Sequence, residues 1–258
     1  MKLLTGQKLK IINNYTPIKC KPDSNSETIS EALYGENFIL KKIYKKWLWG
    51  KLETDDYEGF ISIDSISNKK YEHTHYVSKL RTYTYSKPDI KSVTTDILSI
   101  NSLITIIDEI KGFSKLNNND YIFTEHIELE SNKNNNYIDT AIKFTNTPYK
   151  WGGRTSFGID CSGLVQLSLM SSGYKCPRDS QMQNKVLGKN IPIQTYHDNL
   201  KRGDLIFWDG HVGIMVSSEN IIHANSFSMD TKIEKIIDAD TRIKSNGNRI
   251  SSIKRIII

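Results

Sequence analysis

The chain has 258 residues, of which 38% are hydrophobic and 25% are charged, and its formal net charge is +6 at pH 7. This composition is ordinary for a globular protein and excludes disordered and fibrous classes. No run reaches the roughly 18 apolar residues of a membrane span, and the N-terminal segment lacks a secretory apolar core. We therefore expect a cytoplasmic protein that does not bind membranes, with two or three domains for its length.

Short alternating segments separated by turn residues fill the first half of the chain. The predicted strands are residues 36–43, 47–52 and 57–61, and then, in a weaker second stretch, residues 77–85, 103–107, 112–116 and 121–123. Strands of about five residues at this spacing indicate small antiparallel barrels. The similar order of the two stretches predicts duplication of one barrel type, with a single elaborated barrel as the alternative.

A polar, asparagine-rich stretch at residues 129–136 is predicted to end this half. The expected domains are two barrels, residues 1–72 and 73–130, and a third domain of residues 131–258. Within the third domain, the predicted helices are residues 137–144 and 163–170, and the predicted strands are residues 204–208, 211–216, 221–223 and 253–258. Helices followed by strands indicate an α+β domain with an antiparallel sheet.

The chain has three cysteines, an odd number without a CxxC pair, which argues against a disulfide framework and a zinc site. Cys161 follows a glycine-rich stretch and stands where an apolar helix is predicted to begin. A helix N-terminus favours a thiolate, and Asp160 is the predicted helix cap. These features make Cys161 a candidate nucleophile, whereas Cys20 and Cys176 are interpreted as structural.

A cysteine nucleophile needs a base, and the base needs a partner that orients it. His211 opens one predicted strand and His223 closes the next, so a hairpin can place both imidazoles on one face. Their pairing is offset rather than directly opposite, so their contact is predicted to require a bulge or a strand shift. No third ligand at a convincing spacing accompanies them, so we predict no metal and no cofactor. The other histidines are interpreted as surface residues: His73, His75, His126 and His197.

Several sequence blocks of the third domain are recognisable. They are residues 149–153 (Tyr-Lys-Trp-Gly-Gly), 160–166 (Asp-Cys-Ser-Gly-Leu-Val-Gln), 177–183 (Pro-Arg-Asp-Ser-Gln-Met-Gln), 200–208, 211–214 and 221–224. In this order they resemble the NlpC family of bacterial cell-wall cysteine peptidases, over roughly residues 137–258. The resemblance implies a papain-like fold, with Cys161 as nucleophile, His211 as base and His223 as the orienting residue.

The same resemblance implies supporting roles. Tyr149 is expected to hold the developing oxyanion together with the backbone N–H of Cys161, core packing being the alternative. Asp160 and Ser162 match positions that contact the substrate. For a further group of residues, substrate contact and structural bracing of the cleft wall both stay open: Arg178, Asp179, Ser180 and Gln183.

The barrel half resembles bacterial SH3-like domains, through residues 33–36 (Leu-Tyr-Gly-Glu), Trp47 and Trp49, and residues 57–60 (Tyr-Glu-Gly-Phe). NlpC proteins with this architecture resemble dipeptidyl-peptidase-type enzymes, which cut between γ-D-glutamate and a diamino acid. In them the first barrel recognises the free amino terminus of the peptide. Glu31 and Tyr57 are the candidates for that contact, with a surface or core role equally open.

The expected function is hydrolysis of small murein peptides, such as L-Ala-γ-D-Glu-diaminopimelate or its lysine equivalent, in peptidoglycan recycling. No nucleic-acid partner is expected, because the lysines are scattered along the chain rather than clustered with aromatic residues. The oligomeric state is left open, and a monomer is compatible with the sequence. Two alternatives remain at this point: a non-catalytic protein that binds cell-wall peptides, and an amidase or acyltransferase that uses the same thiolate.

Overall fold

The structure, a computed structural model, describes residues 3–133, 136–193 and 199–256. The chain forms two compact units, one of residues 1–133 with residues 154–156, and one of residues 134–153 with residues 157–258. Across the described ranges, no helix is long and apolar enough to cross a membrane. The finer division at residues 72 and 130 stays a prediction, and His197 lies outside the described residues.

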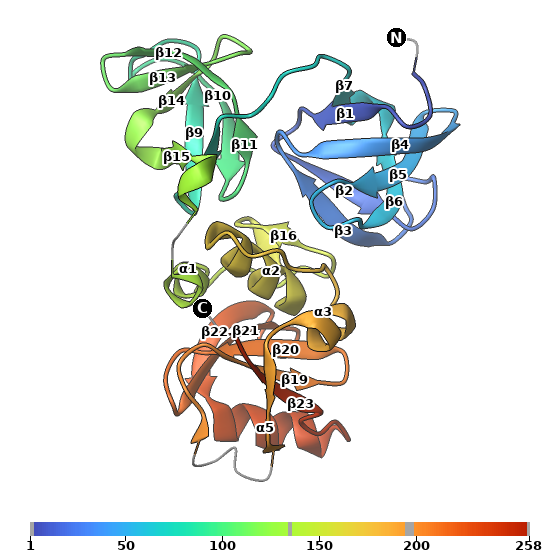
Figure 1. Ribbon diagram of the computed structural model, residues 1–258, viewed down its shortest axis with the longest axis vertical. Coiled ribbons are helices and arrows are strands. Elements are labelled where there is room, and N and C mark those ends of the chain that lie inside the picture. Colours follow the sequence, from blue (N-terminus) through green and yellow to red (C-terminus); the bar gives the residue numbers. More distant parts are fainter. Residues whose placement is uncertain (1–2, 134–135, 194–198, 257–258) are drawn as a thin grey trace. The chain divides into compact units, whose positions relative to one another are not determined.

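Seven strands of the first unit form one antiparallel sheet in the order β3-β2-β6-β5-β4-β1-β7 (Figure 1). Strand β5 shows the alternation that made it predictable, since every second side chain is buried. The strands are β1 (Lys8–Ile11), β2 (Tyr15–Lys19), β3 (Thr28–Leu33), β4 (Asn37–Tyr44), β5 (Trp47–Leu52), β6 (Glu58–Ser62) and β7 (Ile66–Ser67). The strands predicted at residues 36–43, 47–52 and 57–61 are therefore confirmed as β4, β5 and β6.

The next eight strands repeat this pairing order in two sheets, β10-β9-β14-β13-β12 and β11-β8-β15. They are β8 (His75–Val77), β9 (Arg81–Tyr85), β10 (Thr94–Ser99), β11 (Leu103–Ile104), β12 (Ile106–Ile110), β13 (Phe113–Leu116), β14 (Tyr121–Phe123) and β15 (Ile127–Leu129). In the first sheet a single strand, β4, pairs with both β1 and β5. In the second set its place is taken by two shorter strands, because β11 pairs with β8 and β12 pairs with β13. The repeated order supports the predicted duplication.

Two strand predictions in this part were wrong, because the chain crosses from one sheet to the other inside them. The predicted strand 103–107 is interrupted at Thr105, whose hydroxyl donates to the carbonyl of Glu72 at 2.7 Å. The predicted strand 77–85 is interrupted after β8, where the N–H of Ser78 donates to the carbonyl of His126 at 3.0 Å. Local alternation predicts a strand but does not reveal a change of pairing partner.

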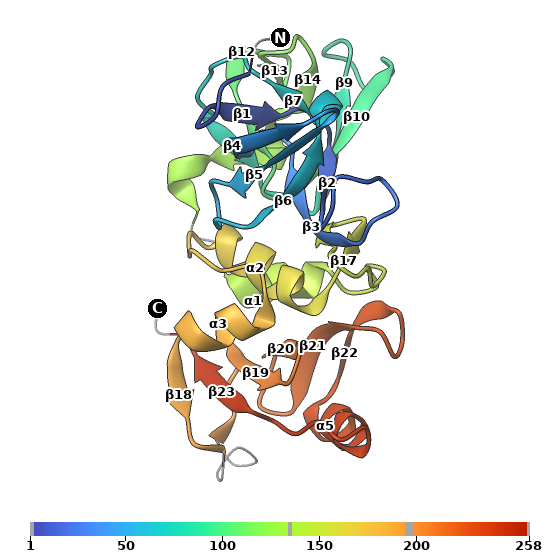
Figure 2. The same cartoon turned by 90° about the vertical axis from the view of Figure 1, so that its right-hand side faces the viewer.

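The second unit contains an antiparallel sheet in the order β18-β23-β19-β20-β21-β22. Its strands are β18 (Lys189–Ile191), β19 (Asp204–Trp208), β20 (His211–Met215), β21 (Asn220–Asn225), β22 (Asp230–Lys235) and β23 (Ser252–Arg255). Figure 2 shows α1 (Tyr137–Lys143) and α2 (Cys161–Ser171) on one side of this sheet and α5 (Ile236–Ser245) on the other. Two two-residue strands, β16 (Arg154–Thr155) and β17 (Gly158–Ile159), precede α2, and α3 (Ser180–Val186) follows it.

The predicted α+β domain with an antiparallel sheet is confirmed. The helices predicted at residues 137–144 and 163–170 correspond to α1 and α2, and four strands lie where they were expected, although β23 ends at Arg255 and residues 257–258 are outside the described ranges. Strand β22 and helix α5 were not predicted. Their signal was present, because Ile236, Ala239 and Ile243 recur at helical spacing and pack in one hydrophobic cluster with Trp208 and Met215 of the sheet.

Candidate active site

Cys161 is the first residue of α2. The carboxylate of Asp160 caps this helix by accepting from the N–H of Gly163 at 2.7 Å, so the predicted cap is confirmed. Gly163 is required here, because a Cβ at this position would lie 2.5 Å from the carbonyl oxygen of Gly153. The helix start is thus held against the glycine-rich stretch, and the sulfur of Cys161 projects from the first turn.

The two histidines come from neighbouring strands, β20 and β21. Ile214 pairs with Ile222 in this hairpin, so His211 lies two residues beyond the position opposite His223. Residues two apart share a face, and a diagonal neighbour is within reach of an aromatic ring. Nε2 of His211 lies 2.8 Å from Nδ1 of His223. The expected bulge or strand shift is therefore unnecessary, and that part of the prediction was wrong.

Gly213 stands opposite the second histidine. A Cβ added to it would lie 2.6 Å from Cδ1 of Ile221 and 3.2 Å from Cβ of His223. His223 itself has no exposed surface. The absence of a side chain at position 213 thus has a steric reason, since a larger residue would collide with Ile221 and press on the buried His223.

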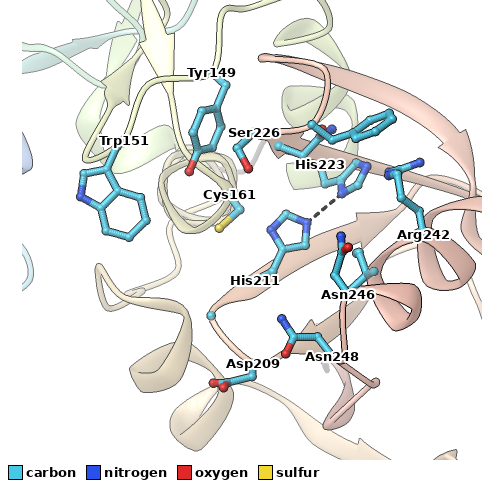
Figure 3. A pocket seen from close by; sticks show the side chains of 14 residues that line it. Tyr149, Trp151, Cys161, Asp209, His211, His223, Ser226, Arg242, Asn246 and Asn248 are labelled. Atoms are coloured by element: carbon cyan, nitrogen blue, oxygen red, sulfur yellow. Dashed lines mark hydrogen bonds between the residues drawn. The ribbon is translucent and has the colours of Figure 1, made fainter.

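Four of the predicted residues line one pocket: Tyr149, Cys161, His211 and His223. Figure 3 shows the sulfur of Cys161 and the ring of His211 pointing toward each other, with the nitrogen that does not contact His223 on the sulfur side. That nitrogen is Nδ1. Within the described ranges, no group of three or more His, Cys, Asp or Glu side chains is placed to hold a metal ion.

Burial controls the charge of this pair. It raises the pKa of Cys161 to about 12, an effect that Asp160 strengthens and the N–H groups of Val212 and Ser162 oppose by donating to the sulfur. Burial also lowers the pKa of His211 to about 3, with His223 and Arg242 adding to the shift. Neither group is therefore charged on its own at neutral pH.

The expectation of a thiolate sustained by the helix N-terminus needs correction. Cys161 is only 8% exposed, and a helix dipole contributes about 0.3–1 kcal/mol to a nearby charge. Removal of a thiolate from water costs more than this contribution. The resting site holds a neutral thiol beside a neutral imidazole, and ionisation requires transfer of the proton from one to the other.

Tyr149 enters the pocket from the segment before the glycine-rich stretch. A parallel bridge to Ile159 positions it, with the N–H of Lys150 donating to the carbonyl of Ile159 at 3.1 Å. Burial, together with the nearby Cys161 and Asp160, raises the pKa of Tyr149 to about 12. Its hydroxyl therefore stays protonated at neutral pH and can act as a hydrogen-bond donor.

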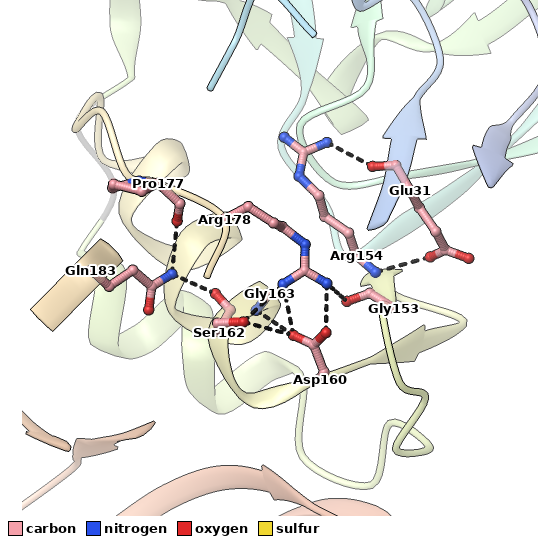
Figure 4. Close-up of polar contacts among 9 residues, drawn as sticks. All are labelled: Glu31, Gly153, Arg154, Asp160, Ser162, Gly163, Pro177, Arg178 and Gln183. Atoms are coloured by element: carbon pink, nitrogen blue, oxygen red, sulfur yellow. Dashed lines mark hydrogen bonds and ion pairs between the residues drawn. The ribbon is translucent and has the colours of Figure 1, made fainter. Parts of the chain in front are cut away.

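Behind Cys161 lies a buried arginine network (Figure 4). Arg178, 1% exposed, donates to both carboxylate oxygens of Asp160 at 2.9 and 2.5 Å and to the hydroxyl of Ser162 at 2.8 Å. Gln183 donates to the backbone carbonyls of Ser162 and Pro177, each at 2.9 Å. These contacts favour bracing of the helix start over substrate contact for Arg178 and Gln183.

The predicted substrate contacts of the second unit lie outside the pocket. Asp179 is the N-cap residue of α3 and Ser180 is its first residue. Among the described residues, none of the five predicted substrate contacts in this unit lines the pocket: Asp160, Ser162, Arg178, Asp179 and Ser180.

The two candidates in the first unit, Glu31 and Tyr57, have different environments. Glu31 is fully buried, and its carboxylate accepts from the N–H of Arg154 at 2.9 Å (Figure 4). The guanidinium of Arg154 donates to Glu36 at 2.7 and 2.9 Å and to the carbonyl of Glu31 at 3.2 Å. Tyr57 is half-buried in the turn before β6. A role for either in ligand binding stays a prediction.

Two residues beside the histidines were missed at the sequence level. Glu234 of β22 accepts from Arg242 of α5, and its Oε1 lies 2.7 Å from Nε2 of His223. Burial does not alternate regularly along β22, so the strand carries no clear signal for Glu234. Neither element was predicted, so neither residue could be assigned.

An α+β fold with a thiol facing two linked imidazoles defines the class of the cysteine peptidases. Comparison with protein families agrees. Residues 146–241 match the NlpC/P60 family, and residues 20–66 match the bacterial dipeptidyl-peptidase Sh3 domain. The chain therefore carries an NlpC/P60 peptidase domain together with an SH3 domain of the bacterial dipeptidyl-peptidase type.

Known relatives extend over most of the chain. Dipeptidyl-peptidase 6 of Lysinibacillus sphaericus is 26% identical over 230 residues, which cover 80% of this chain and 83% of the relative. Gamma-D-glutamyl-L-lysine dipeptidyl-peptidase of Bacillus subtilis (strain 168) is 25% identical over 222 residues, 76% of this chain and 71% of the relative. The fold is shared with an NlpC/P60 family protein from Bacillus cereus ATCC 10987, with a TM-score of 0.81, 19% identity and coverage of 98% and 100% of the two chains.

Proposed function

We propose that this protein is a cysteine peptidase that hydrolyses the γ-D-glutamyl–diamino acid bond of small murein peptides. The observation that carries the proposal is the arrangement of Cys161, His211 and His223 in one pocket, with the two imidazoles 2.8 Å apart. The names of the relatives, dipeptidyl-peptidase 6 and gamma-D-glutamyl-L-lysine dipeptidyl-peptidase, support the type of bond.

In the first step, Nδ1 of His211 takes the proton of the Cys161 thiol while the sulfur attacks the carbonyl carbon of the γ-glutamyl bond. His223 orients the base, because it occupies Nε2 of His211 and leaves Nδ1 for the thiol proton. Transfer within the pair avoids a lone buried charge, which the shifted pKa values of Cys161 and His211 disfavour. The charges form together when the substrate has excluded water from the pocket.

In the second step, the tetrahedral intermediate places negative charge on the former carbonyl oxygen. The hydroxyl of Tyr149 and the backbone N–H of Cys161 are the proposed donors to that oxygen. When the intermediate collapses, the C–N bond breaks, the proton on Nδ1 of His211 passes to the departing amine, and a thioester remains on Cys161. Water, activated by the same imidazole, then hydrolyses the thioester and releases the dipeptide.

Replacement of Tyr149 by phenylalanine tests the proposed oxyanion donor. We expect kcat to fall about 10²-fold, the typical cost of one lost oxyanion donor, with little change in KM. The rate at which iodoacetamide alkylates Cys161 should stay unchanged, because alkylation forms no oxyanion. Tyr174→Phe is the matched control from the same unit. An equal loss in alkylation and in peptide cleavage would mean that Tyr149 acts on the thiol or on packing instead.

The substrate is tested with defined peptides. We expect cleavage of L-Ala-γ-D-Glu-L-Lys or of its diaminopimelate counterpart into L-Ala-γ-D-Glu and the free diamino acid, identified by mass spectrometry. N-acetylation of the alanine should reduce kcat/KM at least about tenfold if a free amine is recognised, since a buried partner of the ammonium group would lose its charge interaction. Glu31 and Tyr57 are the proposed partners, and Glu31→Gln and Tyr57→Phe should each reduce the discrimination between the free and acetylated peptides.

Mass spectrometry also separates the alternatives. Release of dipeptide and diamino acid supports the peptidase. Transfer of the acyl group to an added amine would indicate an acyltransferase. Binding of the peptide without any product would indicate a non-catalytic protein that binds cell-wall peptides. The cytoplasmic location, the role in peptidoglycan recycling, and substrate contacts by Asp160 and Ser162 stay predictions. So do the domain boundaries at residues 72 and 130.

A further inference from the structure

The chain of contacts that starts at the sulfur does not end at His223. Beyond this ring, Oε1 of Glu234 lies 2.7 Å from Nε2. Arg242 then donates to both oxygens of Glu234, at 2.9 and 2.5 Å. The contact between the ring and the carboxylate is shielded, because the His223 side chain is fully buried and that of Glu234 is 13% exposed. Three neighbouring elements thus supply one continuous path, from β21 through β22 to α5.

The groups around the Glu234 carboxylate favour its ionised form. It faces His223 from β21, Arg242 from α5 and, at 3.8 Å, the ammonium of Lys232 on its own strand. Asp238 of α5 acts on Arg242 in turn. Although burial pushes the pKa of Glu234 upward, its hydrogen bonds to His223 and Arg242 lower it to about 2. The carboxylate is therefore charged throughout the range in which an enzyme works.

A charged carboxylate can only accept hydrogen bonds, so when both rings are neutral it determines the tautomer of each. Nε2 of His223 must donate to Glu234, so in the neutral ring Nδ1 is the acceptor. The contact at 2.8 Å then requires Nε2 of His211 to carry its proton. In consequence the free lone pair of His211 is on Nδ1, the nitrogen that faces the sulfur in Figure 3.

We propose that Glu234, held by Arg242, is a positioning residue that sets the proton arrangement of both histidines and stabilises the positive charge they gain from Cys161. The proposal rests on the proposed function for the role of Cys161. The step is a single proton transfer, from the sulfur to Nδ1 of His211, and it leaves a thiolate and an imidazolium. Burial disfavours the positive charge on His211, and the negative charge of Glu234, beyond His223, acts in the opposite direction.

Glu234→Gln tests this idea, since it keeps the size of the side chain and removes its charge. We expect kcat/KM to fall about 10- to 100-fold, as is typical when a partner behind an active-site ligand is lost. Without the carboxylate the imidazolium–thiolate pair is less stable, so less of it forms across the plateau of the pH profile. The pKa of His211 falls as well, because Glu234 raises it, so the acid limb of the profile should not move to higher pH.

Alkylation of Cys161 by iodoacetamide across the same pH range gives a second readout that needs no peptide. In Glu234→Gln, alkylation near neutral pH should slow about as much as kcat/KM falls, whereas alkylation at high pH, where the thiol ionises without His211, should be unchanged. This readout separates the two proposals: failure to cleave murein peptides, combined with slowed alkylation near neutral pH, would overturn the proposed substrate and leave the role of Glu234 intact. Unchanged alkylation near neutral pH would overturn the role of Glu234, whatever the substrate proves to be.

Two further variants complete the design. Glu234→Asp keeps the charge and should retain more of the alkylation rate near neutral pH than Glu234→Gln, and it is the deciding variant if Glu234→Gln does not fold. The exposed Glu219, in the turn between β20 and β21, provides the matched control Glu219→Gln, which should leave both profiles unchanged. An equal loss of rate at neutral and at high pH, in the Gln and Asp variants alike, would show that Glu234 acts on folding only.

Discussion

Replacing Cys161 by alanine or serine is expected to lower peptide turnover by at least about 10³-fold while the protein stays folded. Alanine removes the nucleophile. Serine keeps an oxygen, but its proton is held far more tightly than that of a thiol, and His211 is a weak base because burial lowers its pKa to about 3. The base that suffices for a thiol is therefore not expected to activate a hydroxyl.

The measurement is initial-rate cleavage of the defined tripeptide, with circular dichroism to verify folding. Cys20 is exposed and free, so Cys20→Ser is the control that removes a thiol without touching the pocket. Cys176→Ala removes the other buried thiol of the same unit. A covalent mechanism through Cys161 does not allow Cys161→Ala to retain more than about a tenth of the wild-type rate. Such a residual rate would show that the proposed nucleophile is wrong.

Arg154→Met is expected to destabilise the first unit by roughly 3–5 kcal/mol, the typical cost of leaving one member of a buried ion pair alone. Arg154 has no exposed surface, Glu36 is 1% exposed, and two hydrogen bonds of 2.7 and 2.9 Å join them. Burial alone would raise the pKa of Glu36, yet Arg154 and the N–H of Leu33 hold it below its usual range. Loss of Arg154 therefore leaves a buried charge without its cation.

Urea unfolding of the full chain, followed by tryptophan fluorescence from Trp47 and Trp49 of β5, measures this effect. The double variant Glu36→Gln with Arg154→Met should recover most of the lost stability, because no unpaired charge remains. Lys21→Met at an exposed position is the control and should change stability by less than about 0.5 kcal/mol. A double variant as unstable as the single one would show that Arg154 acts through its packing volume.

Much of the candidate site was predictable because its signals are local. The glycine-rich stretch, the capping carboxylate of Asp160 and the apolar run after it predicted a helix that begins at or just after Cys161, and the structure contains that helix. The hairpin of β20 and β21 followed from two alternating segments joined by a short turn. The diagonal contact of His211 and His223 was harder to foresee, since it depends on the register of the two strands.

Other features could not be predicted from neighbouring residues. The neutral state of Cys161 follows from burial, which depends on segments distant in the sequence. Arg178 could serve either the substrate or the scaffold until its donors were seen to be occupied by Asp160, Ser162 and Gly153. Likewise, a change of pairing partner at Thr105 divided one predicted strand into two.

The order of residues along the chain was sufficient to predict the type of fold and to single out Cys161 and His211 as candidates, because caps, turns and alternation act over a few positions. Which protonation states these groups hold, and which side chains stand behind them, depended on folding. Glu234 and Arg242 reach His223 only once β22 pairs with β21 and α5 packs on the sheet. Electrostatic interactions and desolvation act through space, so the protonation states of these groups depend on the folded unit and not on neighbouring residues in the sequence.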